Sequence, residues 1–253
     1  MTALIYHNSN LYSLEATVLA VFSFTEDGLF KDGTPNHHIV VTDKTIFHPQ
    51  GGGQPSDEGV MKAEYAVFTV TSVRMRDDKV LHLGIFTDQR IFSAGDTIIQ
   101  NIDIDKRILY SRYHTAGHVL GSAVRSLLEN EIEGFDELKA SHFPDSASCE
   151  FRGAIEGKYK PDIQKKVDEV IAAKLPVRIE WWDESDFISN DLQRLIPRKL
   201  SPGEKLRVVN IVGAEVYPCG GTHVETTDLC GPVAVRKIAR KSGVSKVSYT
   251  VME

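Results

Sequence analysis

Two short stretches, about a hundred residues apart, constrain the fold of this chain more than any other feature. His114 and His118 stand four positions apart, a spacing that places both imidazoles on one face of a helix. Cys219 and His223 stand at the two ends of a Gly-Gly turn, where the glycines let the backbone curl until thiol and imidazole converge. Three imidazoles and one thiolate form a ligand set suited to zinc. The two stretches together predict one zinc ion per chain.

Each pair taken alone has a simpler explanation. A histidine at a helix edge is often a satisfied core residue, and a thiol beside glycines is often merely packed. The combination of both pairs favours a metal site. The helix differs from that of zinc peptidases, because Thr115 stands where their motif needs a glutamate. Cys149 and Cys230 have no ligand partner at a diagnostic spacing, so we predict structural roles for both.

Composition indicates an ordinary globular protein. Of 253 residues, 42% are hydrophobic and 25% are charged. No apolar run approaches the roughly 20 residues of a membrane-spanning helix, and the N-terminus does not resemble a signal peptide. Three cysteines are too few, and odd in number, for a disulfide framework. We therefore expect a cytoplasmic protein without membrane contact.

The net charge of −6 does not attract nucleic acid to the protein as a whole. Basic residues nevertheless gather on both sides of the Cys-His stretch, which could guide a polyanion to one face. An ordinary solvated surface explains them equally well. The group before the stretch is Arg194, Arg198, Lys199, Lys205 and Arg207, and the group after it is Arg236, Lys237, Arg240, Lys241 and Lys246.

The first 105 residues read as all-β. Short segments rich in valine, isoleucine, phenylalanine and threonine are separated by turns that contain glycine or aspartate, which is typical of a small barrel or sandwich. The predicted strands are Glu15–Phe24, His37–Phe47, Tyr65–Val73, Lys79–Phe86 and Thr97–Ile104. We predict a β-barrel domain over residues 1–105.

A glycine-rich segment, Phe47–Asp57, interrupts these strands and contains Gly51, Gly52, Gly53 and Gln54. Three successive glycines permit close backbone approach to a ligand, and their amides could cradle an anion. The segment is no P-loop, because no Lys-Ser/Thr follows the glycines. A flexible hairpin connection is the simpler interpretation and is favoured on spacing alone.

The remaining residues, 106–253, predict helices packed on an antiparallel sheet, which gives an α+β fold overall. Apolar residues recur at three and four positions from Ser111 to about Leu128 and again over Pro161–Lys174, which indicates two amphipathic helices. Predicted strands in this half are Ala147–Arg152, Pro176–Trp182, Leu206–Val212, Val233–Ala239 and Lys246–Val251.

These motifs resemble those of the editing domains of alanyl-tRNA synthetase and of their free-standing relatives, the AlaX proteins. The segments that carry the resemblance are His114–His118, Cys219–His223 and the glycine-rich Phe47–Asp57, in the family order and at similar separations. The resemblance runs from about Tyr6 to Val251, and the longer AlaX type, with its glycine-rich β domain, matches best. Two departures stand out: Ser141–Asp145 replaces a segment that contains glutamine in many members, and Asp228 stands where many carry glycine.

The resemblance implies hydrolysis of the ester that joins a wrong amino acid to tRNA(Ala), a reaction that needs no ATP. The mischarged substrate would be Ser-tRNA(Ala), with Gly-tRNA(Ala) as a second candidate. The implied zinc ligands are His114, His118, Cys219 and His223. The hydroxyls of Thr115 and Thr222 and the amide of Gln54 are candidate catalytic or substrate-reading groups, while Gly51–Gly53, Arg236 and Lys237 are candidate tRNA contacts.

Two other functions fit the same residues. A non-catalytic tRNA-binding or adaptor protein could keep the zinc as a scaffold. A zinc hydrolase of small esters or amides is a third reading, which the weak salt dependence of its substrate binding would distinguish. The sequence does not fix the oligomeric state, and a monomer is the default expectation.

Overall fold

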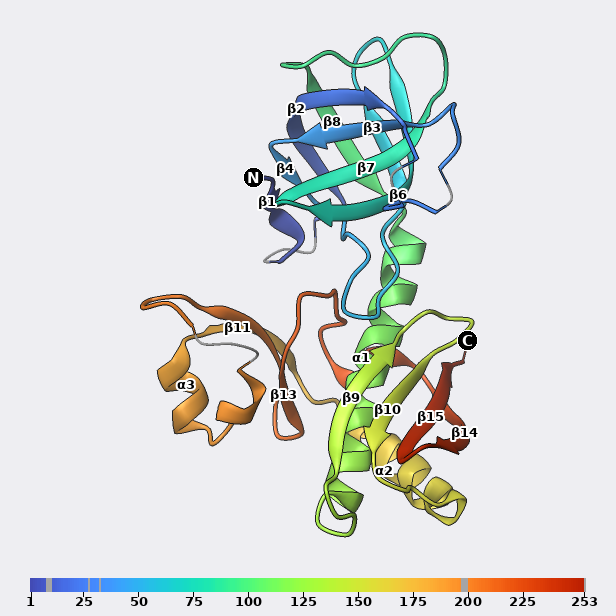
Figure 1. The fold of residues 1–253 in the computed structure, drawn as a ribbon, viewed down its shortest axis with the longest axis vertical. Coiled ribbons are helices and arrows are strands. Elements are labelled where there is room, and N and C mark those ends of the chain that lie inside the picture. The colour runs from blue at the N-terminus through green and yellow to red at the C-terminus, as the bar shows by residue number, and fades with distance from the viewer. Residues whose placement is uncertain (8–10, 27, 32, 197–199, 253) are drawn as a thin grey trace. The chain divides into compact units, whose positions relative to one another are not determined.

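Six antiparallel strands of the first unit, Met1–Leu109, close into a barrel in the order β2-β3-β7-β6-β5-β8 (Figure 1). The second unit is Tyr110–Glu253. The computed structural model describes residues 1–7, 11–26, 28–31, 33–196 and 200–252. The barrel strands are β2 (Ser13–Ser23), β3 (His38–Thr42), β5 (Gly59–Lys62), β6 (Val67–Arg76), β7 (Lys79–Phe86) and β8 (Thr97–Ile102). Each predicted strand segment of this region therefore contains a strand, and the predicted barrel is confirmed.

Three short elements of the first unit escape prediction. They are strand β1 (Ala3–Leu4), the 3-10 turn η1 (Ile5–His7) and strand β5. Strand β1 pairs in parallel with β4 (Lys44–Thr45), which lies within the predicted segment His37–Phe47. Strand β5 has four residues and β1 has two, which is too short for an alternating pattern to emerge. The barrel interior is filled by side chains with almost no exposure, among them Phe47, Phe68, Met61 and Ile98.

The glycine-rich segment is a hairpin, as the simpler interpretation held, but hydrogen bonds hold it in place. Gly51 and Gln54 pair across a tight turn, with Gln54 N–H donating to Gly51 O at 2.9 Å. Gly52 and Gly53 occupy the turn with φ of +56° and +78°. Both values lie in the left-handed region that residues with a side chain avoid, which explains the glycines at these two positions. Gln50 N–H donates to Val73 O at 3.0 Å and fixes the hairpin on the barrel.

A buried ion pair joins this segment to the start of helix α1 (Ile104–Leu128). The Arg107 guanidinium pairs with the Asp57 carboxylate and also donates to Ile46 O at 2.6 Å. Asp57 in turn accepts from the backbone N–H of His48 at 2.6 Å. Both charged side chains are almost fully buried, so each depends on the other to offset its desolvation.

Helix α1 begins seven residues earlier than the predicted Ser111. Asp103 provides the missed start, because its carboxylate accepts from the backbone N–H of Lys106 at 3.0 Å, as an N-cap side chain does. The predicted strand Thr97–Ile104 included Asp103, whereas β8 ends at Ile102 and leaves Asp103 to cap the helix. The boundary between the two units, after Leu109, consequently falls inside α1.

In the second unit, α1 packs on a four-stranded antiparallel sheet in the order β14-β15-β10-β9. Tyr249 Oη of β15 donates to Tyr113 O of the helix, and Cys149 Sγ of β10 donates to Gly117 O. The predicted helix-on-antiparallel-sheet arrangement is confirmed. The elements are β9 (Asp136–Ser141), β10 (Ser148–Arg152), β14 (Val233–Lys241), β15 (Val244–Val251), α2 (Lys160–Ala172) and the 3-10 turns η2 (Gly157–Tyr159) and η4 (Thr227–Cys230).

A second antiparallel sheet of this unit, in the order β11-β12-β13, was not predicted as a separate layer. Helix α3 (Glu184–Ser189) packs on one of its faces, where Phe187 meets Trp182 and Val208. Its members are β11 (Val177–Trp182), β12 (Leu206–Ile211), β13 (Glu215–Pro218) and the nearby turn η3 (Gln193–Leu195). Among the described residues, no helix combines the length and apolar character required to cross a bilayer.

The buried ion pair of the barrel generates a first prediction. Arg107→Met leaves the Asp57 carboxylate buried without its cation, so we expect the free energy of unfolding to fall by about 3–5 kcal/mol. Lys106→Met is the matched control, because Lys106 pairs with Glu58 at a half-exposed position and should cost less than about 1 kcal/mol. Urea denaturation of both variants measures the difference, and equal losses would contradict the role given to Arg107.

Two buried imidazoles predict that acid destabilises the barrel. Burial lowers the pKa of His48 to about 4, and burial lowers the pKa of His82 to about 4, from an ordinary value of 6.5. The unfolded chain therefore binds more protons in this interval, and the stability contributed by the neutral imidazoles is lost as the pH falls from 6.5 toward 4.

The measurement is the free energy of unfolding at several pH values between about 5 and 6. His82→Asn should reduce its slope against pH by about one proton's worth, roughly 1.4 kcal/mol per pH unit. The asparagine amide can still donate to Val40 O, as His82 Nδ1 does at 2.9 Å. An unchanged slope would show that the His82 imidazole is already positively charged in the folded barrel.

Candidate metal centre

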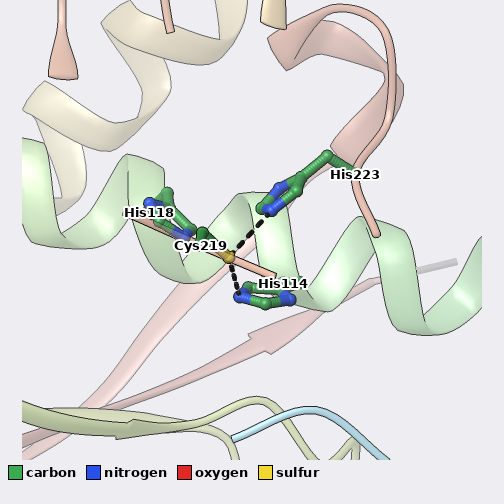
Figure 2. A group of neighbouring side chains, drawn as sticks. All are labelled: His114, His118, Cys219 and His223. Atoms are coloured by element: carbon green, nitrogen blue, oxygen red, sulfur yellow. Dashed lines mark hydrogen bonds between the residues drawn. The ribbon is translucent and has the colours of Figure 1, made fainter. Parts of the chain in front are cut away.

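His114, His118, Cys219 and His223 converge on one point in the second unit (Figure 2). One ligand atom from each residue lies within 4.8 Å of all the others. Cys219 Sγ lies 3.4 Å from His114 Nε2 and 3.4 Å from His223 Nε2. Two sequence stretches separated by about a hundred residues thus supply a single cluster, as their spacings predict.

The spacing of these atoms fits a tetrahedral metal ion. With bonds of about 2.0–2.1 Å to nitrogen and about 2.3 Å to sulfur, neighbouring ligand atoms of a zinc site stand about 3.4–3.6 Å apart. The two Sγ–Nε2 distances of 3.4 Å match that edge, and the other pairs of ligand atoms lie within 4.8 Å of each other. The donor set of nitrogen and sulfur also suits zinc better than it suits calcium or magnesium, which prefer oxygen. The cluster could therefore hold a metal ion.

Backbone contacts fix the Cys219 thiol in place. The N–H of Gly221 donates to Sγ at 3.4 Å, and the Arg207 guanidinium donates to Cys219 O. Although burial raises the pKa of Cys219, the hydrogen bond and charge of His118 outweigh it and leave the pKa below its ordinary value. By contrast, burial raises the pKa of Cys149 and raises that of Cys230 to about 12, in keeping with structural thiols. All three cysteines are free of disulfides.

Two of the imidazoles are oriented through their outer nitrogens. His118 Nδ1 lies 3.1 Å from the Glu215 carboxylate, and His223 Nδ1 lies 3.1 Å from Thr115 Oγ1. A proton held on each Nδ1 leaves the Nε2 lone pair of that ring free for the cluster. Burial alone would lower the pKa of His118, but hydrogen bonds with Cys219 and Glu215 raise it to about 10. At neutral pH the Cys219 thiol and the Glu215 carboxylate thus hold a second proton on His118, and a metal cation bound at Nε2 would take the place of that proton.

Sequence reasoning missed Glu215, although the chain carries a signal for it. Glu215 and Tyr217 alternate along β13, and Cys219 follows directly after the strand, where its N–H still donates to Arg207 O of β12; the period of two places the three residues on one face. That face meets α1, since the Tyr217 ring also lies 5.9 Å from the His118 ring. The strand is only four residues long, so its alternation was not recognised.

A further histidine, His142, stacks on the His114 ring at 4.2 Å. Its Nδ1 lies 2.8 Å from Tyr249 Oη, whose single hydrogen is already donated to Tyr113 O. His142 Nδ1 must therefore donate to Tyr249, which leaves its Nε2 as an acceptor. Burial and the nearby His118 lower the pKa of His142 to about 3, so the ring stays neutral.

Gly117, inside the first motif, makes room for this arrangement. A Cβ at Gly117 would lie 2.3 Å from His142 Cε1 and 2.7 Å from Tyr249 Oη, distances that no real side chain tolerates. Glycine inside a helix costs about 1 kcal/mol relative to alanine. Its presence between the two ligands of α1 is explained by the approach of His142 to the helix backbone.

The other residues singled out from the sequence lie in varied surroundings. Thr115 is fully buried and accepts from Val224 N–H as well as meeting His223, while Thr222 is nearly buried and bonds Ser111 Oγ at 2.8 Å. Gly51–Gly53 and Gln54 belong to the barrel unit, where Gln54 is fully buried.

The basic clusters divide into exposed and buried members. Arg236 and Lys237 are exposed on β14. Arg207 is buried beside Cys219, so its prediction as part of a solvent-facing basic cluster is wrong. Arg198 and Lys199 lie outside the described residues.

Comparison with known proteins places the chain among proteins of alanyl-tRNA synthesis and editing. Residues 2–106 match the family model "tRNA synthetases class II (A)", and residues 206–247 match "Threonyl and Alanyl tRNA synthetase second additional domain". The alanyl-tRNA editing protein AlaX-L of Pyrococcus horikoshii is 31% identical over 204 residues, which cover 80% of this chain and 48% of that protein. Over four fifths of its length the chain is thus similar to an alanyl-tRNA editing protein.

Alanine–tRNA ligases also align with nearly the whole of this chain. That of Methanothrix thermoacetophila is 28% identical over 251 residues, 99% of this chain and 25% of the ligase. That of Halorubrum lacusprofundi is 30% identical over 249 residues, 97% of this chain and 25% of the ligase. The chain thus spans about a quarter of the length of these ligases and about half that of AlaX-L.

The contact between Glu215 and His118 generates a third prediction. Glu215→Gln removes the negative charge that orients the imidazole, so we expect the affinity for Zn²⁺ to fall by about 10- to 100-fold. Competition with a chromophoric chelator measures it. Glu129→Gln is the control, because Glu129 meets only Arg125 at a half-exposed position, and it should leave the affinity unchanged. Equal affinities for Glu215→Gln and the wild type would remove Glu215 from the metal centre.

Proposed function

We propose that this chain hydrolyses the ester that links a wrongly attached amino acid to tRNA(Ala), with Ser-tRNA(Ala) as the main substrate and Gly-tRNA(Ala) as a second one. The observation that carries the proposal is the cluster of three imidazoles and one low-pKa thiol, in a chain similar to an alanyl-tRNA editing protein. Such editing is needed because a pocket for a small side chain discriminates poorly between near-isosteres.

The proposed cofactor is one zinc ion per chain, held by His114, His118, Cys219 and His223. When bound, zinc would supply a Lewis acid that holds and polarises the aminoacyl group. Four protein ligands complete a tetrahedral shell, which favours a positioning role for the ion. Glu215 and Thr115 support this site by holding the outer nitrogens of His118 and His223.

His142 is the proposed hydrogen-bond acceptor for the bound ester. Its Nε2 carries a lone pair next to the His114 ring, and its neutral state lets it accept from an ammonium, a hydroxyl or a water. We assign Thr115 and Thr222 to the walls of the same site rather than to proton transfer. Both hydroxyls are engaged with other side chains, at 3.1 Å to His223 and 2.8 Å to Ser111.

The tRNA itself is proposed to meet other parts of the chain. Arg236 and Lys237 are exposed cations of β14 suited to phosphate contacts. Gly51–Gly53 present a tight turn to which a backbone could approach closely, and the fully buried Gln54 closes that turn through its hydrogen bond to Gly51 O. In this proposal residues 1–105 form the barrel domain that carries the turn and residues 106–253 form the editing domain, in a cytoplasmic monomer.

A non-catalytic adaptor that keeps the metal as a scaffold is the second candidate. The fully formed contacts around the cluster serve a scaffold as well as an enzyme. It differs from the hydrolase in one respect: zinc would be bound and no ester turned over.

A deacylation assay gives the fourth prediction. The zinc-loaded chain should hydrolyse Ser-tRNA(Ala) at least about tenfold faster than Ala-tRNA(Ala), since one hydroxyl read by a hydrogen bond is worth about 1–3 kcal/mol. Cys219→Ala should abolish hydrolysis and metal binding together, whereas Cys230→Ala, a buried thiol outside the cluster, should retain both if the fold is kept. Bound zinc without turnover of the seryl ester would favour the adaptor.

A further inference from the structure

A row of residues leads across the second sheet from the metal centre to an exposed tryptophan. Trp181 of β11 pairs directly with Arg207 of β12. Arg207 O accepts from Cys219 N–H at 3.1 Å, so Arg207 in turn stands opposite Cys219 at the end of β13. Residues directly opposite in a sheet point to the same face. Trp181, Arg207 and Cys219 therefore share one face, the face on which Glu215 and Tyr217 meet His118.

The two faces of this sheet are covered differently. Trp182, the next residue along β11, points the other way and is buried against Phe187 of α3. Trp181 keeps 41% of its surface exposed, and Ile179, two residues earlier on the same face, keeps 37%. Strand β11 forms an edge of its sheet, with β12 as its neighbour. Trp181 is thus partly exposed at the edge of the sheet face that also carries Cys219.

The separation between this indole and the cluster follows from the strand spacing. Neighbouring strands lie about 4.8 Å apart, so the backbone of Trp181 stands about 10 Å from that of Cys219. In an aminoacyl-tRNA the ester is attached to the ribose of the last nucleotide, and the base of that nucleotide lies one sugar away. An ester held at the cluster therefore has its terminal base within reach of Trp181.

The chemistry of Trp181 suits a base. Exposed aromatic rings beside cations are the usual platforms for single-stranded nucleotides, because every base offers a flat face to stack on an indole. We propose that Trp181 is the stacking platform for the 3′-terminal base of the tRNA, two strands away from the metal centre. This inference rests on the proposed function, since it takes the substrate to be an RNA-borne ester.

The fifth prediction uses binding, which does not require hydrolysis. The probe is an RNA hairpin that reproduces the acceptor end of tRNA(Ala) and carries no amino acid. It is compared with the same hairpin whose last nucleotide lacks its base. Trp181→Ala should weaken binding of the intact hairpin about tenfold, the size expected for one stacked base. Trp181→Phe should stay within about threefold of the wild type, because it keeps an aromatic face.

The losses of binding affinity caused by removing the base and by removing the indole should not be additive. The wild type should bind the abasic hairpin about tenfold more weakly than the intact one, and Trp181→Ala should lose nothing further on it. Ile188→Ala is the matched control, since Ile188 is 55% exposed on α3, and it should bind both hairpins as the wild type does. Zinc content measured for each variant verifies the fold.

Losses that add, or a Trp181→Ala variant that binds the intact hairpin as tightly as the wild type, would overturn the proposal. The fate of the proposed function is read separately. If the wild type does not hydrolyse Ser-tRNA(Ala) but the non-additive binding pattern holds, the platform stands and the chain is an RNA-binding adaptor. If hydrolysis occurs and binding ignores Trp181, the platform fails and the deacylase stands.

Discussion

The Cys219 thiol, drawn against imidazoles of α1 and of its own turn, is the interaction on which the second unit depends. It brings together a helix and a turn about a hundred residues apart, and its two 3.4 Å contacts from Sγ have the length of an edge of a tetrahedral zinc site. Three neighbouring groups orient the side chains of the cluster through hydrogen bonds. Glu215 on β13, Thr115 on α1 and the backbone N–H of Gly221 each hold one ligand in its orientation.

Helix α1 is locally less stable because of a glycine that this site requires. Gly117 weakens α1 at its centre, yet any side chain there would collide with His142 and Tyr249. The same opening allows the hydrogen bonds that run from Tyr113 O through Tyr249 to His142, which fix the tautomer of the ring stacked on His114. The short motif around the two ligand histidines thus encodes an unusually close approach as well as a ligand spacing.

Much of this arrangement could be predicted from the sequence, and the failures have physical reasons. The spacings of His114 with His118 and of Cys219 with His223 predicted their convergence, because helix and turn geometry are local. Five of the six barrel strands were predicted because each extends over five or more residues, whereas β5, with four, was missed. Strand β13, with four residues, is too short for that pattern, and with it Glu215 was missed. The start of α1 was missed because Asp103 caps a helix directly after a strand.

Partnerships over long separations were beyond such reasoning. Arg207 looked like part of a basic surface, but the structure buries it against the backbone of Cys219. The pairing of Trp181 with Arg207 likewise depends on a strand register that no local pattern reveals.

Arg107 lies just beyond residue 105, where the composition of the chain changes, although its guanidinium is buried in the barrel with Asp57. An expression fragment that ended at residue 105 would leave that carboxylate buried without a counter-ion. Extending the fragment to Leu109 would retain the cation together with its carboxylate, at the boundary that the packing itself defines. For anyone who divides this protein into separately produced halves, the first turn of the long helix therefore has to be cloned with the barrel.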